Sequence, residues 1–158
     1  MKKKERMSEA VFVDKARTGS SLKSKERVKQ TGECFTPMEL INEMLDQIPA
    51  EMFAPGKTFL EPAAGDGNMV VEYLKRKMEN GCTPTEALKD TFAVEYMKDN
   101  LEAMRKRVLE LCGRTPEHEE IVNEQIVHAN FLDEMDTFDG RCYPRWLRQS
   151  HQIDDFFV

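Results

Sequence analysis

Thr58-Phe-Leu-Glu-Pro-Ala-Ala-Gly-Asp-Gly-Asn-Met69 is the most informative stretch of this chain. It predicts a short apolar strand over residues 58–60, a carboxylate where the strand ends, a glycine turn and a helix over residues 69–78. The two glycines can take positive φ and allow a ligand to approach the backbone closely. The free N–H groups of the following helix face the same turn. Because ligands of open α/β sheets bind at the carboxyl ends of the strands, Glu61 is a candidate binding residue.

Strands and helices alternate on both sides of this stretch. Upstream, Thr36, Pro37 and Glu39 have the residue types of a capping box, which predicts a helix from Pro37 to the residue before Pro49. Its apolar stripe contains Leu40, Ile41, Met44, Leu45 and Ile48. Downstream we expect a capped helix over residues 83–90, a strand over 91–94, a helix over 98–111, a polar loop, a strand over 125–128 and a fourth strand from Phe138. This alternation predicts a parallel sheet built from βαβ units.

The size and composition of the chain restrict its class. With 158 residues, 40% hydrophobic and 33% charged, it is long enough for one globular domain with its own core. No apolar run approaches the roughly 18 residues of a membrane span, and no apolar segment follows the Lys-rich N-terminus. We therefore expect a cytoplasmic protein without a membrane partner. The four widely spaced cysteines (Cys34, Cys82, Cys112 and Cys142) favour reduced thiols over a metal site or disulfides.

Charge is distributed unevenly along the chain. The formal net charge is −6, yet residues 1–30 contain ten Lys/Arg and only four Asp/Glu. We interpret residues 1–24 as a basic, flexible leader with one short element near residues 10–13, and residues 25–158 as the folded domain. The leader could contact the phosphates of DNA or RNA, or it could be a solvated arm. The acidic remainder argues against tight non-specific duplex binding by this chain alone.

Polar side chains follow each of the three predicted strands. Glu61 ends the first strand, Glu95 ends the second, and residues 130–133 follow the third. In a parallel sheet these positions are neighbours along one edge. Glu61 could hold a cationic or amino-bearing group. Glu95 could accept hydrogen bonds from a ribose diol, as acids do in nucleoside-containing cofactor sites, or it could be an ordinary acid at a strand end.

Four segments of the chain, taken in order, resemble the class I S-adenosylmethionine-dependent methyltransferases. They are most similar to the gamma-type N6-adenine DNA methylases of restriction-modification systems and bacteriophages, over residues 25–139. Gly32-Glu-Cys-Phe-Thr-Pro37 is similar to the segment that precedes the first strand and helps to hold the methionine part of the cofactor. Phe59-Leu-Glu-Pro-Ala-Ala-Gly-Asp-Gly-Asn68 resembles the Asp/Glu-Pro-Ala-x-Gly-x-Gly signature. Phe92-Ala-Val-Glu-Tyr96 resembles the ribose-binding acid motif, and His128-Ala-Asn-Phe-Leu-Asp133 resembles the segment that meets the adenine amino group.

The resemblance implies an α/β, Rossmann-like methyltransferase fold, with a mainly parallel sheet, flanking helices and a truncated C-terminal side. It implies S-adenosylmethionine as the cofactor and no metal. Tyr96 and Met97 are placed to flank the adenine ring. The cofactor-binding residues that it implies are Phe35, Thr36, Pro37, Glu61, Pro62, Ala63, Gly65, Asp66, Gly67, Asn68, Glu95, Tyr96, Met97, Asn130, Phe131 and Leu132.

The catalytic motif is where this sequence departs from the family. The family has Asn/Asp-Pro-Pro-aromatic soon after position 139, and its Asn or Asp accepts from the target amino group. Here the sequence reads Tyr143-Pro-Arg-Trp146, and a phenol is a poor substitute for a carboxamide in that role. Asp139, Tyr143 and Pro144 are the catalytic candidates.

Three functions therefore stay open. The first is an adenine-N6 DNA methyltransferase, with a second protein chain as a candidate partner for target recognition. The second is a catalytically inactive S-adenosylmethionine-binding regulator or partner subunit. The third is an enzyme that uses the same cofactor with a small-molecule or protein acceptor.

Overall fold

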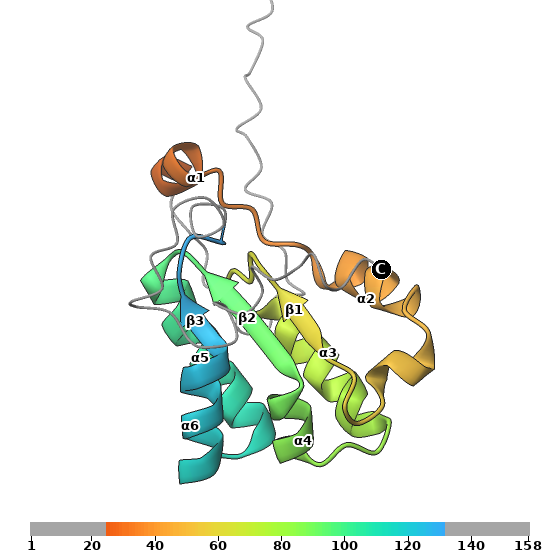
Figure 1. The fold of residues 1–158 in the computed structure, drawn as a ribbon. Coiled ribbons are helices and arrows are strands. Elements are labelled where there is room, and N and C mark those ends of the chain that lie inside the picture. The colour runs from red at the N-terminus through yellow and green to blue at the C-terminus, as the bar shows by residue number, and fades with distance from the viewer. Residues whose placement is uncertain (1–24, 132–158) are drawn as a thin grey trace, which may run out of the picture.

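The computed structural model describes residues 25–131, in which a three-stranded parallel sheet is flanked by helices (Figure 1). The strands are β1 (Phe59–Glu61), β2 (Thr91–Glu95) and β3 (Ile126–His128), in that spatial order. The helices are α1 (Lys25–Thr31), α2 (Met38–Asp46), the 3₁₀ helix η1 (Ala50–Phe53), α3 (Asn68–Glu79), α4 (Pro84–Lys89), α5 (Lys98–Cys112) and α6 (Pro116–Gln125). The expected parallel sheet with flanking helices is thus confirmed for this part of the chain.

The register of the sheet brings the ends of the strands to one edge. β1 pairs with β2 so that Glu61 lies beside Ala93, and β2 pairs with β3 so that Glu95 lies beside His128. Ala93 belongs to the main core under α3, α4, α5 and α6, whereas its neighbour Val94 lies in a smaller buried cluster with Val127. This alternation is the period of two that a strand imposes. Figure 1 shows α1 beyond the carboxyl ends of the strands and α4 near their amino ends.

A second buried cluster attaches α2 to α3. Ile41 and Leu45 are 1% exposed and pack with Phe53 and Tyr73, while the ring of Phe59 stacks on that of Tyr73 at 4.1 Å. The other side of the predicted apolar stripe does not pack in this way, since Leu40 and Met44 are each 47% exposed. The cluster fixes where α2 lies, and therefore where the chain enters it from residues 32–37.

The structure corrects the prediction of a capping box at the start of α2. The N-cap is Pro37, with φ −60° and ψ 146°, and no side chain caps the helix. Thr36 therefore stands one position too early to accept from the free N–H groups. The second capping box is confirmed, because the Thr83 side chain accepts from the Glu86 N–H and Glu86 accepts from the Thr83 N–H at 2.8 Å.

A second prediction is wrong as well. The polar loop expected before the third strand is helix α6, which begins with Pro116 after a Thr115 cap on the His118 N–H. Only His118 and Val122 of this helix are buried, so its sequence has no apolar stripe from which the helix could be predicted.

Some predictions lie outside the described residues. They are the basic leader over 1–24, the element near residues 10–13, the strand at Phe138, and the site residues Leu132, Asp139, Tyr143 and Pro144. Within residues 25–131, no helix combines the length and apolar character of a membrane-spanning segment.

Candidate functional site

A cavity of about 760 Å³ lies at the carboxyl ends of the strands. Its walls come from five parts of the chain: the end of α1 with residues 32–35, the turn after β1, the end of β2, the first turn of α5, and the residues after β3. A volume of this size falls in the range of roughly 300–1,000 Å³ that small-molecule sites occupy.

A smaller cavity of about 220 Å³ adjoins the first. The two share Cys34, Phe35, Ala63 and Gly65 as lining residues. The smaller one extends from this shared wall toward α2 and the start of α3. Two carboxylates line it, those of Glu61 and Asp66.

Glu95 holds the glycine turn against the end of β2. Its Oε2 accepts from the Gly65 N–H at 2.7 Å and its Oε1 accepts from the Met97 N–H at 2.7 Å, while the Ala64 N–H donates to the Val94 carbonyl at 3.0 Å. A carboxylate oxygen can accept two hydrogen bonds. Oε1 also accepts from the Asn100 amide nitrogen at 3.5 Å, whereas Oε2 accepts only from Gly65 within residues 25–131 and keeps acceptor capacity. The same side chain can therefore fix the turn and bind donors in the cavity.

The two glycines of the turn have different reasons for lacking a side chain. Gly65 has φ +57°, and a Cβ there would lie 3.2 Å from the ring of Phe35, which lines both cavities. Gly67 has φ +86°, and a Cβ there would meet Met104 of α5 at 2.5 Å. Gly65 thus shapes the cavity wall, whereas Gly67 permits α3 to pack against α5.

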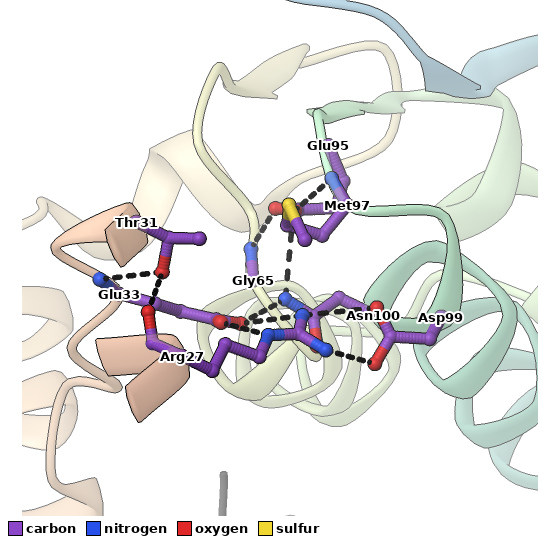
Figure 2. A network of polar contacts seen from close by, with 8 residues as sticks. All are labelled: Arg27, Thr31, Glu33, Gly65, Glu95, Met97, Asp99 and Asn100. Carbon is purple, nitrogen blue, oxygen red and sulfur yellow. Dashed lines mark hydrogen bonds and ion pairs between the residues drawn. The ribbon is translucent and has the colours of Figure 1, made fainter. Parts of the chain in front are cut away.

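A polar network joins several residues that line the larger cavity to Arg27 and Asp99 (Figure 2). Arg27 donates to Glu33 and to Asp99, and the Asn100 amide nitrogen donates to Glu33 and lies 3.5 Å from Glu95 Oε1. The hydrogen bonds that Arg27 donates, first those to Asp99 and then those to Glu33, raise the pKa of its guanidinium above its ordinary value. Asn100 is 1% exposed, and its Oδ1 has no hydrogen-bond partner among residues 25–131.

Asp66 is a buried carboxylate in the wall of the smaller cavity. It is 1% exposed, and neither carboxylate oxygen accepts a hydrogen bond from the part of the chain that the structure describes. Arg107 lies 3.5 Å from Oδ1 and donates instead to the Asp66 carbonyl at 2.6 Å. Its other nitrogen donates to Asn68 Oδ1 at 3.0 Å. Arg107 therefore compensates the charge of Asp66 but leaves its hydrogen-bonding capacity unused.

Most of the site residues expected from the sequence lie around these two cavities. Pro37 and Gly67 line neither of them. The expected residues that line the larger cavity are Phe35, Pro62, Ala63, Gly65, Glu95, Tyr96, Met97, Asn130 and Phe131. Those that line only the smaller cavity are Thr36, Glu61, Asp66 and Asn68.

Sequence reasoning missed Glu33, Cys34 and Asn100, which also line the larger cavity. Glu33 and Cys34 stand inside the quoted segment 32–37, so they could have been included. Asn100 lies in the first turn of α5, the helix that follows β2 and Glu95. That position in the chain is the one feature from which its place in the cavity wall could have been predicted.

The chemistry of the lining is anionic and rich in acceptors. Glu33, Glu61 and Glu95 surround the cavities, and Tyr96 is an aromatic side chain that is 64% exposed. Such walls suit a ligand with hydroxyl or amino donors and a positive charge, and they repel phosphate. No group of three His, Cys, Asp or Glu side chains within residues 25–131 could hold a metal ion.

No protein-family model, curated protein or solved structure matches this chain. What can be inferred about its function therefore rests on the residues around the two cavities.

Proposed function

We propose that this chain binds S-adenosylmethionine in the manner of class I methyltransferases and that its activity is methylation of adenine N6 in DNA. One observation supports the proposal above others. Residues from four segments, chosen because each resembles a family motif, line two adjoining cavities at one edge of a parallel sheet. These segments are separated in the sequence. The fold brings them together, and that is a separate observation from the similarity of each segment to a motif.

The residues present fit the cofactor. The unused acceptor capacity of Glu95 Oε2 suits a ribose hydroxyl, and the exposed ring of Tyr96 suits an adenine face. Glu61 in the smaller cavity suits the ammonium group of the amino-acid end through its negative charge. When bound, S-adenosylmethionine would supply an electrophilic methyl group on its positively charged sulfur. The chain's own contribution is to orient the two ends of that molecule and to neutralise its charge.

A second candidate function has a specific observation in its favour. Tyr143-Pro-Arg-Trp146 stands where the family has Asn/Asp-Pro-Pro-aromatic. A tyrosine hydroxyl at that position is a poor substitute for the amide or carboxylate oxygen that accepts from the target amino group and makes its nitrogen a better nucleophile. The alternative is a protein that binds the cofactor without methyl transfer and acts as a regulator or partner subunit.

Two measurements on one sample separate these functions. Calorimetric titration with S-adenosylmethionine is expected to give binding that Glu95→Gln weakens and that Glu110→Gln, on the exposed face of α5, leaves unchanged. The same sample is then given methyl-labelled cofactor and unmethylated DNA. Label in adenine N6 supports the methyltransferase, and binding without transfer supports the second candidate. Absence of S-adenosylmethionine binding would contradict both candidate functions.

A further inference from the structure

Helix α1 forms one wall of the larger cavity without entering the core. Gln30 and Thr31 at its end line the cavity together with Glu33 and Phe35. Among residues 26–131, no α1 side chain belongs to a buried cluster, and Val28 is 42% exposed. This wall therefore lacks the apolar anchor that holds the other helices.

Arg27 joins this wall to the body of the domain. Its Nη1 lies 2.6 Å from Asp99 Oδ2 and its Nη2 lies 2.9 Å from Asp99 Oδ1, which is a bidentate pair. Its Nε donates to Glu33 Oε2 at 2.7 Å. Figure 2 shows the guanidinium between the two carboxylates. One side chain of α1 thus bridges residue 33 of the wall and the first turn of α5.

The bridge is connected to the ligand-binding carboxylate. The Asn100 amide nitrogen donates to Glu33 and approaches Glu95 Oε1 to 3.5 Å. Glu33 is therefore shared between Arg27 on the outside and Asn100 on the inside. A ligand that donates to Glu95 acts on the same network that holds the wall in place.

We propose that α1 and residues 32–35 are a lid on the larger cavity and that Arg27 is its latch. The ligand leaves when the Arg27 bridge to Asp99 opens and the Asn100 contact with Glu33 then separates. Ion pairs with partly exposed partners are weak and are screened by salt, so this bridge opens far more readily than the packed helices separate. The identity of the ligand rests on the proposed function, whereas the latch itself does not.

The first test needs no ligand. Amide hydrogen exchange across residues 28–35 is compared in the wild type, Arg27→Ala and Lys29→Ala; Lys29 is a cation on the same helix without an ion pair in the described part of the chain. We expect faster exchange in Arg27→Ala alone. Exchange that is equal in the two variants overturns the latch, whether or not the protein binds S-adenosylmethionine. Failure of the latch and failure of the proposed function are thereby distinguished.

The second test measures departure of S-adenosylmethionine in a displacement experiment. Dissociation from Arg27→Ala is expected to be about fivefold faster than from the wild type, the equivalent of losing one partly exposed ion pair. Lys29→Ala is expected to match the wild type. Asp99→Asn should reproduce the Arg27→Ala effect, and the double variant should add nothing, because both changes open the same bridge. An unchanged dissociation rate in Arg27→Ala, or additive effects, overturns the gating role.

Discussion

Lys77 near the amino ends of the strands and two buried side chains at their carboxyl ends use their hydrogen-bonding capacity in opposite ways. Near the amino ends of the strands, Lys77 is fully buried, and its Nζ donates to the carbonyls of Ala54 at 3.0 Å and Lys57 at 2.8 Å and to Asp90 Oδ2 at 2.7 Å. An ammonium has three donors, so all are used. At the carboxyl ends, Asn100 and Asp66 are each 1% exposed, yet acceptor atoms of both have no hydrogen-bond partner within residues 25–131. Gln125 Oε1, just before β3, also lacks a partner within residues 25–131.

This difference separates what the fold needs from what a ligand needs. A buried polar cluster whose members satisfy one another fixes the geometry of the chain around it. A buried acceptor without a donor costs free energy, and such groups are found where something beyond the fold requires them. The Lys77 cluster at the amino end is therefore interpreted as structural, and the residues around Glu95 and Asp66 at the carboxyl end as the binding site. Substitutions at the first should change stability, and those at the second should change binding.

The largest effect is expected for Lys77→Met. The substitution leaves the Asp90 carboxylate and two carbonyls without their cation, and one-sided removal of a buried ion pair costs about 3–5 kcal/mol. Urea unfolding should show this loss of stability, while calorimetry on the folded fraction should show unchanged affinity for S-adenosylmethionine. Lys75→Met is the matched control, because its side chain is 45% exposed on the same helix and should change stability by less than about 0.5 kcal/mol. Weakened affinity in Lys77→Met would contradict the assignment of a purely structural role to the Lys77 cluster.

Gly65→Val tests the carboxyl end through the backbone. Residue 65 has φ +57° and residue 81 has φ +95°, so a side chain is strained at both, at about 1–3 kcal/mol each. Space differs, because a Cβ at 65 lies 3.2 Å from Phe35 whereas one at 81 meets nothing within 4 Å. Gly65→Val should lose stability and S-adenosylmethionine binding together; Gly81→Val should lose stability alone. Retained binding in Gly65→Val would show that the turn does not shape the site.

Glu95→Gln tests the acceptor itself and is expected to act mainly on binding. The amide keeps one acceptor oxygen for a backbone N–H but replaces the other by a donor, so the affinity for S-adenosylmethionine should fall by about 1–3 kcal/mol. Glu110→Gln, whose side chain is 61% exposed near the end of α5, should leave the affinity unchanged. Calorimetry on both variants is the measurement. Equal affinities would assign Glu95 to holding the turn and to nothing more.

The residues at the strand ends that line the cavities were easier to name from the sequence than the contacts of Lys77, for a physical reason. Glu61, Gly65 and Glu95 are local signals, because each follows a short apolar strand and the parallel sheet brings strand ends together. The contacts of Lys77 join a helix to two loops that lie far from it in the sequence. The spacing of Val70, Tyr73 and Leu74 places position 77 on the buried face of α3, but a lysine is rarely buried, so its residue type hides the role.

The same reasoning explains the missed helices and the missed part of the site. α1 has no buried face, and α6 buries only His118 and Val122, so apolar periodicity could reveal neither. The Arg27 bridge joins residues far apart in the sequence, and ion pairs of that kind leave no spacing to detect. The capping box at residues 83–86 was predictable because both of its partners lie within one turn.

That capping box supplies the smallest predicted effect, and it belongs to the amino end. The Thr83 backbone N–H and hydroxyl both donate to Glu86 and hold the pKa of its carboxyl below the usual 4.5. A lowered pKa in the folded state means that this stability is present above the unfolded pKa and is lost as the pH falls through the folded pKa. Glu86→Gln should therefore be slightly less stable than the wild type in urea unfolding at neutral pH, and the difference should vanish in acid. A difference that stays constant with pH would contradict the charged cap. S-adenosylmethionine affinity at neutral pH should be unchanged, because Glu86 opens a helix at the end of the sheet opposite to both cavities.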